Sequence, residues 1–296
     1  MILSIGEILY DVFPDQRRLG GAPFNFAFHL KRFGFPVRFV SRVGGDGAGG
    51  DILRRIEVAG FAAEDVRIDP NHETGSVRVT LDGRGTPSFH ILPDVAYDYI
   101  SADSHVAALV ESVPKLIYFG SLIQRTGVGF QNLHDILDNR AGGTRLFYDM
   151  NLREGCRRAD IIEASLSRTD ILKLSEEELD ASARLLGIPG RGNALVDSLM
   201  ARFDISVTAL TRGADGSCLY MNGRRYDAMP ASNIRIVDTV GAGDAYAAML
   251  AAGILEEQPP KTIISEATRF SGRICAIGGA IPDNRKFYDD FRREAT

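Results

Sequence analysis

The sequence predicts an α/β fold in which a doubly wound, mostly parallel sheet carries a small β-sheet lid. Short apolar runs rich in β-branched residues alternate with amphipathic stretches of helical period, which is typical of a parallel sheet covered by helices. A hairpin pattern interrupts this alternation before residue 100. The chain has 296 residues, enough to bury one large core and carry a small appendage.

Six apolar runs are predicted as strands of the main sheet, and their composition indicates burial on both faces. These are Ile2–Ile5, Val37–Val43, Leu116–Phe119, Leu146–Met150, Ile171–Leu174 and Ile205–Leu210. Five amphipathic stretches between them are predicted as helices. These are Phe24–Phe33, Asp51–Ala59, Phe130–Asn139, Glu176–Leu186 and Asn193–Phe203.

Two β-rich segments have no helix within them. The first, Thr74–Leu81 with Ser88–Leu92, turns at residues 82–85 (Asp-Gly-Arg-Gly). It is either a lid over a site that must exclude water or an antiparallel edge of the sheet. The second segment turns at Asn222-Gly223 and is predicted to contain three strands. These are Ser217–Tyr220, Arg225–Met229 and Ile234–Val237.

Composition and charge indicate a globular protein of the cytoplasm with neither nucleic acid nor membrane as a partner. The formal net charge is −5, which predicts no attraction to nucleic acid or to an anionic membrane surface. No apolar run approaches the roughly 20 residues that cross a bilayer, and the first residues lack the basic start of a signal peptide. The three cysteines are scattered singly, which fits a reducing compartment.

The segment Asp238–Asp244 carries the chemistry. It reads Asp-Thr-Val-Gly-Ala-Gly-Asp and leads into an alanine-rich run that favours helix. A glycine-rich turn that opens a helix presents free N–H groups, and the helix dipole attracts negative charge there. The amides of Gly241, Ala242 and Gly243 could hold a phosphoryl group, and Asp244 could accept a hydroxyl proton. The alternative is an ordinary glycine turn followed by an acidic residue.

A second segment, Gly20–Asn25, reads Gly-Gly-Ala-Pro-Phe-Asn and leads into the first predicted helix. Its glycines allow the backbone to approach a ligand, and Asn25 offers both a donor and an acceptor to a polyol. Taken alone, this segment is a loop that enters a helix.

Together the two segments resemble the signatures of a known family. Gly-Gly-Ala-Pro-x-Asn-x-Ala from Gly20, followed by Gly34 and Gly44, resembles the N-terminal signature of the ribokinase-like (PfkB) carbohydrate kinases. Asp-Thr-x-Gly-Ala-Gly-Asp resembles their C-terminal signature, and the likeness extends over essentially the whole chain. The resemblance implies a core of residues 1–10, 20–73 and 100–296 and a β lid of residues 11–19 and 74–99. A homodimer formed through the lid is a further expectation.

The resemblance assigns roles to the residues around the sugar. It makes Asp244 the catalytic base and Gly241, Ala242 and Gly243 the anion hole. Residues expected to contact the sugar are Asp11, Gly20, Gly21 and Asn25.

The resemblance also implies ATP and Mg²⁺ as cofactors. The loop that starts at Thr211 and includes Gly213 and Gly216 resembles the family's nucleotide loop. The segment from Lys173 to Glu178 resembles an Asn-x-x-Glu element that organises Mg²⁺ and phosphate, although Ser175 stands where the family has Asn. A glutamate that acts through metal-bound waters suits Mg²⁺, which keeps much of its hydration. Asp238 and the carbonyl of Val240 match a site for a monovalent cation such as K⁺.

Local features look more like fructokinases, above all the bacterial ones, than like ribokinases. Leu9 stands where ribokinases carry an Asn that binds ribose, and the lid runs through Phe89, which could cap an apolar sugar face. Asp149–Arg153 resembles an element of fructokinases and of 2-keto-3-deoxygluconate kinases. Arg153 could pair with phosphate or with an acidic substrate. The expected reaction is therefore phosphorylation of D-fructose to fructose 6-phosphate, with the keto-acid sugar or another small sugar or nucleoside as the alternative.

Two other classes of function compete with a kinase. A literal Gly-x-Gly-x-x-Gly at residues 45–50 lies between a predicted strand and helix, and Glu64 and Asp65 follow near the spacing of a ribose-binding acid. This pattern allows a nicotinamide-dependent dehydrogenase, although it follows the second strand rather than the first. A non-catalytic sugar sensor would have lost the base or the anion hole, and both are present. No P-loop, zinc-protease or serine-hydrolase motif occurs, and the five histidines are scattered.

Overall fold

The computed structural model describes residues 1–81, 87–231, 234–282 and 284–294, except for the side chains of residues 81, 87–89 and 154. Strands and helices alternate along most of the chain, as the apolar pattern predicts. The strands are β1 (Ile2–Ile5), β2 (Leu9–Val12), β3 (Arg17–Gly20), β4 (Val37–Gly44), β5 (Val66–Asp69), β6 (Ser76–Leu81), β7 (Pro87–Ile91), β8 (Leu116–Gly120), β9 (Arg145–Asp149), β10 (Ile171–Ser175), β11 (Val207–Thr211), β12 (Ser217–Met221) and β13 (Arg224–Ala228).

The helices follow the same alternation. They are α1 (Ala22–Arg32), α2 (Gly47–Val58), α3 (Ser104–Glu111), α4 (Gly127–Asp138), α5 (Ala159–Leu166), α6 (Glu176–Leu186), α7 (Gly192–Phe203), α8 (Ala242–Leu255), α9 (Pro260–Cys275) and α10 (Lys286–Arg293). None of the described helices is long and apolar enough to cross a membrane.

The main sheet has nine strands in the order β13-β12-β11-β10-β9-β8-β1-β4-β5. Neighbouring strands in the part β11-β10-β9-β8-β1-β4-β5 of this order are parallel. Strands β12 and β13 extend the sheet beyond β11 as an antiparallel hairpin. Strand β1 is third from the β5 edge, and the chain adds strands outward from it in both directions. Ligands of such sheets bind at the carboxyl ends of the strands near this reversal of order.

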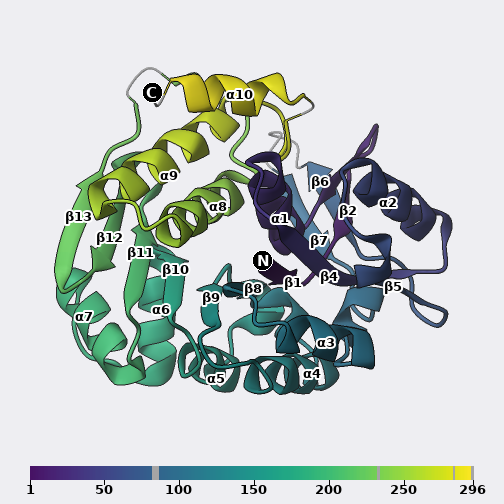
Figure 1. The fold of residues 1–296 in the computed structure, drawn as a ribbon, viewed down its shortest axis with the longest axis horizontal. Helices are drawn as coiled ribbons and strands as arrows, with labels where there is room; N and C mark the ends of the chain where they lie inside the picture. The colour runs from purple at the N-terminus through teal and green to yellow at the C-terminus, as the bar shows by residue number, and fades with distance from the viewer. Residues whose placement is uncertain (82–86, 232–233, 283, 295–296) are drawn as a thin grey trace.

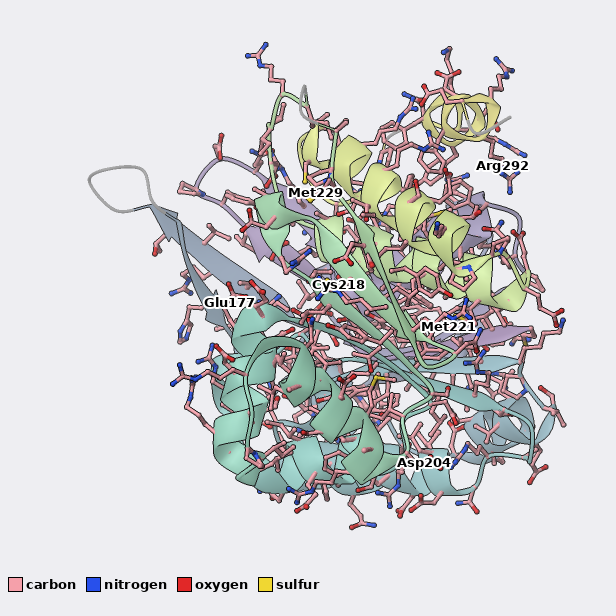
Figure 2. The ribbon with its side chains drawn as sticks, turned by 90° about the vertical axis from the view of Figure 1, so that its left-hand side faces the viewer. Glu177, Asp204, Cys218, Met221, Met229 and Arg292 are labelled. Carbon is pink, nitrogen blue, oxygen red and sulfur yellow. The ribbon has the colours of Figure 1, made fainter. Side chains whose placement is uncertain are left out.

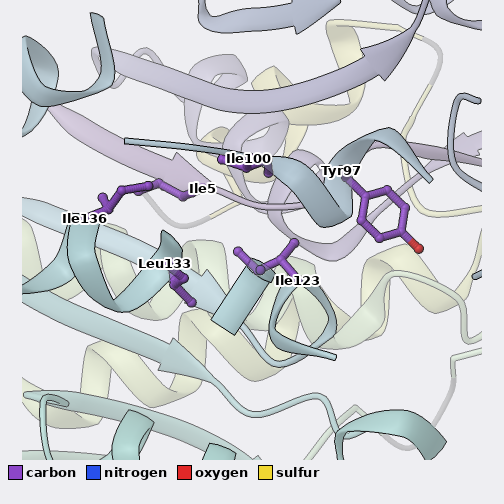
Figure 3. A pocket seen from close by; sticks show the side chains of 7 residues that line it. Ile5, Tyr97, Ile100, Ile123, Leu133 and Ile136 are labelled. Atoms are coloured by element: carbon purple, nitrogen blue, oxygen red, sulfur yellow. The ribbon is translucent and has the colours of Figure 1, made fainter. Parts of the chain in front are cut away.

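Helices cover both faces of the main sheet (Figure 1). Helices α1, α8 and α9 pack on one face, where the apolar core includes Phe26, Ala247 and Phe270. Helices α3 to α7 pack on the other face over a second core. Figure 3 shows part of this second core, where the side chains leave no water-sized space. Its labelled residues are Ile5, Tyr97, Ile100, Ile123, Leu133 and Ile136.

A separate small sheet of four strands has the order β3-β2-β6-β7. Strands β2 and β3 come directly after β1, and β6 and β7 come after β5, so two distant segments build this sheet. The hairpin of β6 and β7 extends away from the body of the molecule in Figure 2. The fold class predicted from the sequence, a mostly parallel sheet with a small second sheet, is confirmed.

Several predicted elements differ from the structure. The segment Ile234–Val237 is not a strand: it leads to α8, and the Val237 amide donates to the Cys275 carbonyl at 2.8 Å. Helix α2 begins at Gly47 rather than Asp51, because the Asp46 side chain caps it by accepting the Gly49 amide. Strands β2, β3 and β5 and helices α3, α5, α9 and α10 were not among the predicted elements. The predicted turn at residues 82–85 lies outside the described residues.

Candidate active site

Asp244 lies in the first turn of α8, beside a stretch of free backbone N–H groups. Gly241 precedes the helix with a φ of 79°, in the left-handed region that glycine adopts without strain. A Cβ on Gly241 would overlap Ala280, so no larger residue fits. Within the described residues the amides of Gly241 and Gly243 have no backbone acceptor, and the Ala242 amide has a long bond of 3.3 Å to Thr239. This helix start can therefore bind an anion.

A direct hydrogen bond joins the two sequence segments. The Asn25 side chain in α1 donates from Nδ2 to Oδ2 of Asp244 at 2.7 Å, across 219 residues of sequence. Asn25 is 3% exposed, and helices α1 and α8 pack against each other. The bond fixes one oxygen of the Asp244 carboxylate and leaves the other for a ligand.

Other acidic groups surround Asp244 on the side of the small sheet. Asp11 in β2 faces Gly20 in β3: a Cβ on Gly20 would lie 3.0 Å from Oδ2 of Asp11. Burial raises the pKa of Asp11 to about 6, the Arg153 charge opposes this, and the Asp244 charge adds to it. Burial likewise raises the pKa of Glu7 to about 7. Glu7 was not predicted as a site residue, and only its place between the first strand and Asp11 could have indicated it.

A buried ion pair lies on the other side of Gly243. The Lys173 ammonium contacts Oδ1 of Asp149 at 2.8 Å, and the Tyr118 hydroxyl donates to Oδ2 of Asp149 at 2.9 Å. Burial lowers the pKa of Lys173, but the charges of Asp149, Glu178 and Asp244 outweigh it and hold the pKa above its usual value. Burial raises the pKa of Asp149 to about 6 against the pull of Lys173. A Cβ on Gly243 would lie 3.1 Å from the Lys173 nitrogen, so this cation borders the anion-binding turn.

Ser175 and Glu178 form the capping box that starts α6. Ser175 Oγ accepts the Glu178 amide at 3.2 Å, and Oε2 of Glu178 accepts the Ser175 amide at 2.8 Å. Oε1 of Glu178 accepts the Leu152 amide at 2.7 Å. Both carboxylate oxygens thus hold backbone groups, and each keeps a lone pair for one further donor, such as a metal-bound water. The described residues contain no cluster of three or more His, Cys, Asp or Glu side chains that could hold a metal ion.

The predicted nucleotide loop lies at the carboxyl end of β11. Thr211 ends this strand opposite Ser175 of β10, so the loop and the start of α6 share one edge of the sheet. Gly213 and Gly216 enclose a short 3₁₀ turn. The exposed apolar side chains of Met229, Ile236 and Val237 follow later in the chain.

Asp238 holds three donors in this structure. Its Oδ2 faces the Arg18 guanidinium at 3.2 Å and accepts the Gly279 amide at 3.0 Å, and its Oδ1 accepts the Val240 amide at 3.0 Å. Arg18 belongs to β3, so this ion pair connects the small sheet to the segment before α8. Arg18 was missed from the sequence, because nothing local indicates a partner 220 residues away.

Two predicted sugar residues have less defined positions. Phe89 lies in β7 opposite Val79, and its side chain is outside the described part of the structure. Arg153 is exposed after β9, and its charge lowers the pKa values of Glu7 and Asp11. Arg153 therefore lies near enough to Glu7 and Asp11 for its positive charge to affect their ionisation.

The Gly-x-Gly-x-x-Gly segment does not form an anion site. The Asp46 carboxylate occupies the N-terminus of α2, where it accepts the Gly49 amide and the Thr74 amide, each at 2.8 Å. A pyrophosphate at this position would meet that negative charge. Asp65 is also engaged, because the Arg38 guanidinium binds both of its oxygens. The geometry thus speaks against dinucleotide binding here.

A surface cavity of about 280 Å³ lies away from these residues. It is lined by Asn193, Met221 and Arg224 at the end of the β12–β13 hairpin opposite the nucleotide loop. Figure 2 shows Met221 and Met229 at the two ends of this hairpin. The cavity is thus separate from Asp244.

Comparison with known proteins identifies the class of this fold and site. The model of the pfkB family carbohydrate kinases matches residues 2–286. An uncharacterized sugar kinase of Pyrococcus horikoshii is 30% identical over 273 residues, which cover 86% of this chain and 83% of that protein. A fructokinase of Rhizobium leguminosarum is 26% identical over 274 residues, which cover 86% of this chain and 79% of that protein.

A solved structure agrees with both. The crystal structure of the P. horikoshii sugar kinase in complex with ATP superimposes with a TM-score of 0.78 and 27% identity, over 95% of this chain and 94% of that chain. The fold is thus that of enzymes that phosphorylate sugars. The chain belongs to the pfkB family of carbohydrate kinases, which confirms the family predicted from its two signatures.

Proposed function

We propose that this sugar kinase transfers the γ-phosphoryl group of ATP to a hydroxyl of D-fructose and forms fructose 6-phosphate. The observation that carries the reaction is the position of Asp244, held by Asn25 at a helix start where the Gly241 and Gly243 amides have no backbone acceptor among the described residues. Asp244 accepts the proton of the attacking hydroxyl as that oxygen bonds to the γ-phosphorus, while the bond from this phosphorus to the bridging oxygen breaks and ADP leaves. The amides of Gly241, Ala242 and Gly243 stabilise the charge on the transferred group.

Positioning supplies most of the rate in such a transfer. Asp11 and Asn25 bind the sugar hydroxyls, and Gly20 and Gly21 allow the backbone to approach them. Residues Thr211, Gly213 and Gly216 bind the nucleotide. Lys173, next to Gly243, offsets the charge of the incoming phosphate, while its bond to Asp149 keeps it in place.

Mg²⁺ and Glu178 form the proposed metal site. Each Glu178 oxygen has a free lone pair, which suits a metal-bound water better than direct coordination. Bound Mg²⁺ supplies charge neutralisation at the β- and γ-phosphates. Ser175 holds Glu178 in place through the capping box.

A monovalent cation fits Asp238 poorly in this conformation. The Arg18 guanidinium already provides a positive charge at the carboxylate, and the Val240 and Gly279 amides fill its remaining positions. No step of the proposed reaction therefore depends on K⁺ at Asp238 and Val240.

The charge balance of the site favours a neutral sugar. Arg18 is already paired with Asp238, so Asp11 and Asp244 face Arg153 on the sugar side, and an acidic sugar would add a further negative charge. The 2-keto-3-deoxygluconate alternative rests on the exposure of Arg153. Its guanidinium could turn away from Asp11 and pair with the carboxylate of such a substrate.

The small sheet serves as the lid in this proposal, with Phe89 over the sugar. Its outer strands β3 and β7 have free edges within the described residues and could pair with a second copy to form a homodimer. Cysteines 156, 218 and 275 are unpaired, which supports a cytoplasmic location.

An ADP-release assay over a panel of acceptors tests the function. The panel contains fructose, ribose, tagatose, 2-keto-3-deoxygluconate and nucleosides, each with ATP and Mg²⁺. We expect the highest kcat/KM for fructose. If kcat/KM is highest for the keto-acid sugar, that sugar is the substrate and Arg153 is the residue expected to bind its carboxylate. An absence of turnover with every acceptor would contradict the proposed class of substrate.

A further inference from the structure

Glu7 is a buried carboxyl group between the main sheet and the small sheet. It lies between β1 and β2 and is 4% exposed. Its Oε1 accepts the Ala22 amide at 3.3 Å. This amide belongs to the N-terminus of α1, where Gly21 is the capping residue and has no side chain to accept it. Glu7 therefore supplies the cap from another segment.

The segment around Glu7 packs tightly against the loop that enters α1. A Cβ on Gly6 would overlap the Pro23 ring, and a Cβ on Gly21 would overlap the Glu7 carbonyl. Gly21 also has a φ of 110°, which side chains with a Cβ rarely adopt. The position of the sugar-binding loop thus depends on the segment that carries Glu7.

Two buried oxygen atoms on the segments that meet at this contact have no partner among the described residues. They are Oε2 of Glu7 and Oδ1 of Asn25, and neither has a hydrogen bond among the described residues. Both are acceptors when Glu7 is ionised, so they cannot bond to each other. A proton on Oε2 provides a donor for Oδ1 of Asn25, directly or through one water. The other end of the Asn25 amide then donates to Asp244, as observed.

The charged groups around Glu7 favour this proton. Burial raises the pKa of Glu7 to about 7; its own amide opposes the rise, Asp244 of α8 adds to it, and Arg153 after β9 opposes it. Three further titratable neighbours are uncharged near neutral pH, and burial raises the pKa of each. They are Tyr97, Tyr118 and Cys156.

We propose that Glu7 is a positioning residue whose uncharged carboxyl group fixes the start of α1 and orients the Asn25 amide toward Asp244. This inference rests on the proposed function, since it gives a reason for the geometry of the base. It adds a pH dependence on the sugar side of the site that does not come from the base itself.

The sign of that dependence follows from the direction of the pKa shift. A carboxyl group whose pKa is higher in the folded state than in the unfolded state stabilises the fold at low pH. The contribution is complete below the unfolded value of 4.5 and is lost as pH rises through about 7. Ionised Glu7 also lacks the donor for Asn25, so sugar binding weakens over the same range.

The test compares wild type with Glu7→Gln, Glu7→Ala and the control Glu57→Gln, whose carboxylate is exposed on α2. Glutamine keeps an oxygen for the Ala22 amide and carries a permanent donor for Asn25. We expect Glu7→Gln to have a sugar KM that is flat from pH 7 to 8.5, above the pKa of about 6 of Asp11, while KM rises severalfold in wild type and in Glu57→Gln. The Tm gap between Glu7→Gln and wild type should widen from pH 5 to 8. Glu7→Ala should lose roughly tenfold or more in kcat/KM, because both bonds are gone.

Two outcomes would overturn the proposal. Equal pH slopes of KM and Tm in Glu7→Gln and wild type would show that Glu7 does not titrate in this range. A tenfold rise of KM in Glu7→Gln at every pH would show that the charge itself is required. Because Tm is measured without turnover, these results stay distinct from a failure of Asp244 as the base, which would appear as activity retained in Asp244→Asn.

Discussion

At the scale of single residues, the proposed reaction depends on the Asp244 carboxylate. It lies at the N-terminus of α8 with one oxygen bonded to Asn25. We predict that Asp244→Asn lowers kcat by about 10²–10⁴-fold, because the amide cannot accept the hydroxyl proton. The sugar KM should change little. ADP release measures both quantities.

The control for this variant is Asp180→Asn, a carboxylate that is exposed on α6. It should leave kcat unchanged. Retention of more than about a few per cent of turnover by Asp244→Asn would contradict the assignment of the base, since a positioned base contributes more than that.

Asn25 contributes to the site through two interactions, its bond to Asp244 and its proposed bonds to the sugar. We predict that Asn25→Ala raises the sugar KM by about tenfold, the cost of one lost hydrogen bond at a buried polar group. Asn25→Asp should lose more, because it places a second negative charge 2.7 Å from Asp244. Steady-state kinetics with varied sugar provide the measurement, and an unchanged KM in both variants would remove Asn25 from the sugar site.

Residues in the two signature segments could be found from the sequence, since each follows a glycine pattern with a physical meaning. Glu7 and Arg18 could not, because each acts through a partner that only the folded chain brings near. The element that starts at Asp149 was recognised, but its ion pair with Lys173 was not. Glu178 was predicted as a metal residue, and the sequence alone could not show that its oxygens already hold two backbone amides.

At the scale of elements, the ion pair of Arg18 and Asp238 joins β3 of the small sheet to the segment before α8. The side chains are 38% and 23% exposed, so the pair contributes only about 0–1 kcal/mol to global stability. We predict that Arg18→Ala instead increases hydrogen exchange locally, in β2 and β3. High salt should have the same effect on wild type, since it screens exposed charges.

Arg78→Ala is the matched control for this change. Arg78 is exposed on β6 of the same sheet, and no ion pair of its side chain is found among the described residues. Exchange in β2 and β3 should equal that of wild type in this control. Equal exchange in Arg18→Ala and Arg78→Ala would show that the ion pair does not hold the small sheet.

Strands β9 and β10 are joined by the buried pair of Asp149 and Lys173. We predict that Lys173→Met lowers the free energy of unfolding by about 3–5 kcal/mol, because Asp149 stays buried without its cation. The control Lys286→Met breaks an exposed pair with Asp290 in α10 and should cost less than about 1 kcal/mol. Urea unfolding measures the free energy of unfolding of both variants. A similar decrease in the two would contradict the claim that burial makes the Asp149–Lys173 pair more important for stability than an exposed pair.

At the scale of the whole molecule, the sequence predicted the fold class and most strands of the main sheet. Long apolar runs on a buried parallel sheet carry a strong signal. Strands β2, β3 and β5 have four residues each and mix polar with apolar side chains, so their pattern is weak. Strands β2 and β5 pair with the distant strands β6 and β4, which no local window contains, and β3 pairs with β2.

Ligand binding should distinguish a kinase from a dehydrogenase in the intact protein. A ligand at 100 times its Kd stabilises the folded state by about 2.7 kcal/mol. We predict that ATP with Mg²⁺ raises the Tm, and that NADH and NADPH do not, because Asp46 occupies the N-terminus of α2. Differential scanning fluorimetry is the measurement, and stabilisation by a reduced nicotinamide cofactor alone would contradict this account of the glycine-rich segment.

The packing of α1 on α8 also has a consequence for protein synthesis. A ribosome adds about 5–20 residues per second, so the 219 residues between Asn25 and Asp244 take roughly 10–45 s to appear. Throughout that interval α1 carries apolar side chains such as Phe26 whose final neighbours include residues of α8. The nascent chain therefore exposes this surface until its last third is made, and a chaperone that shields it would increase the yield of active enzyme.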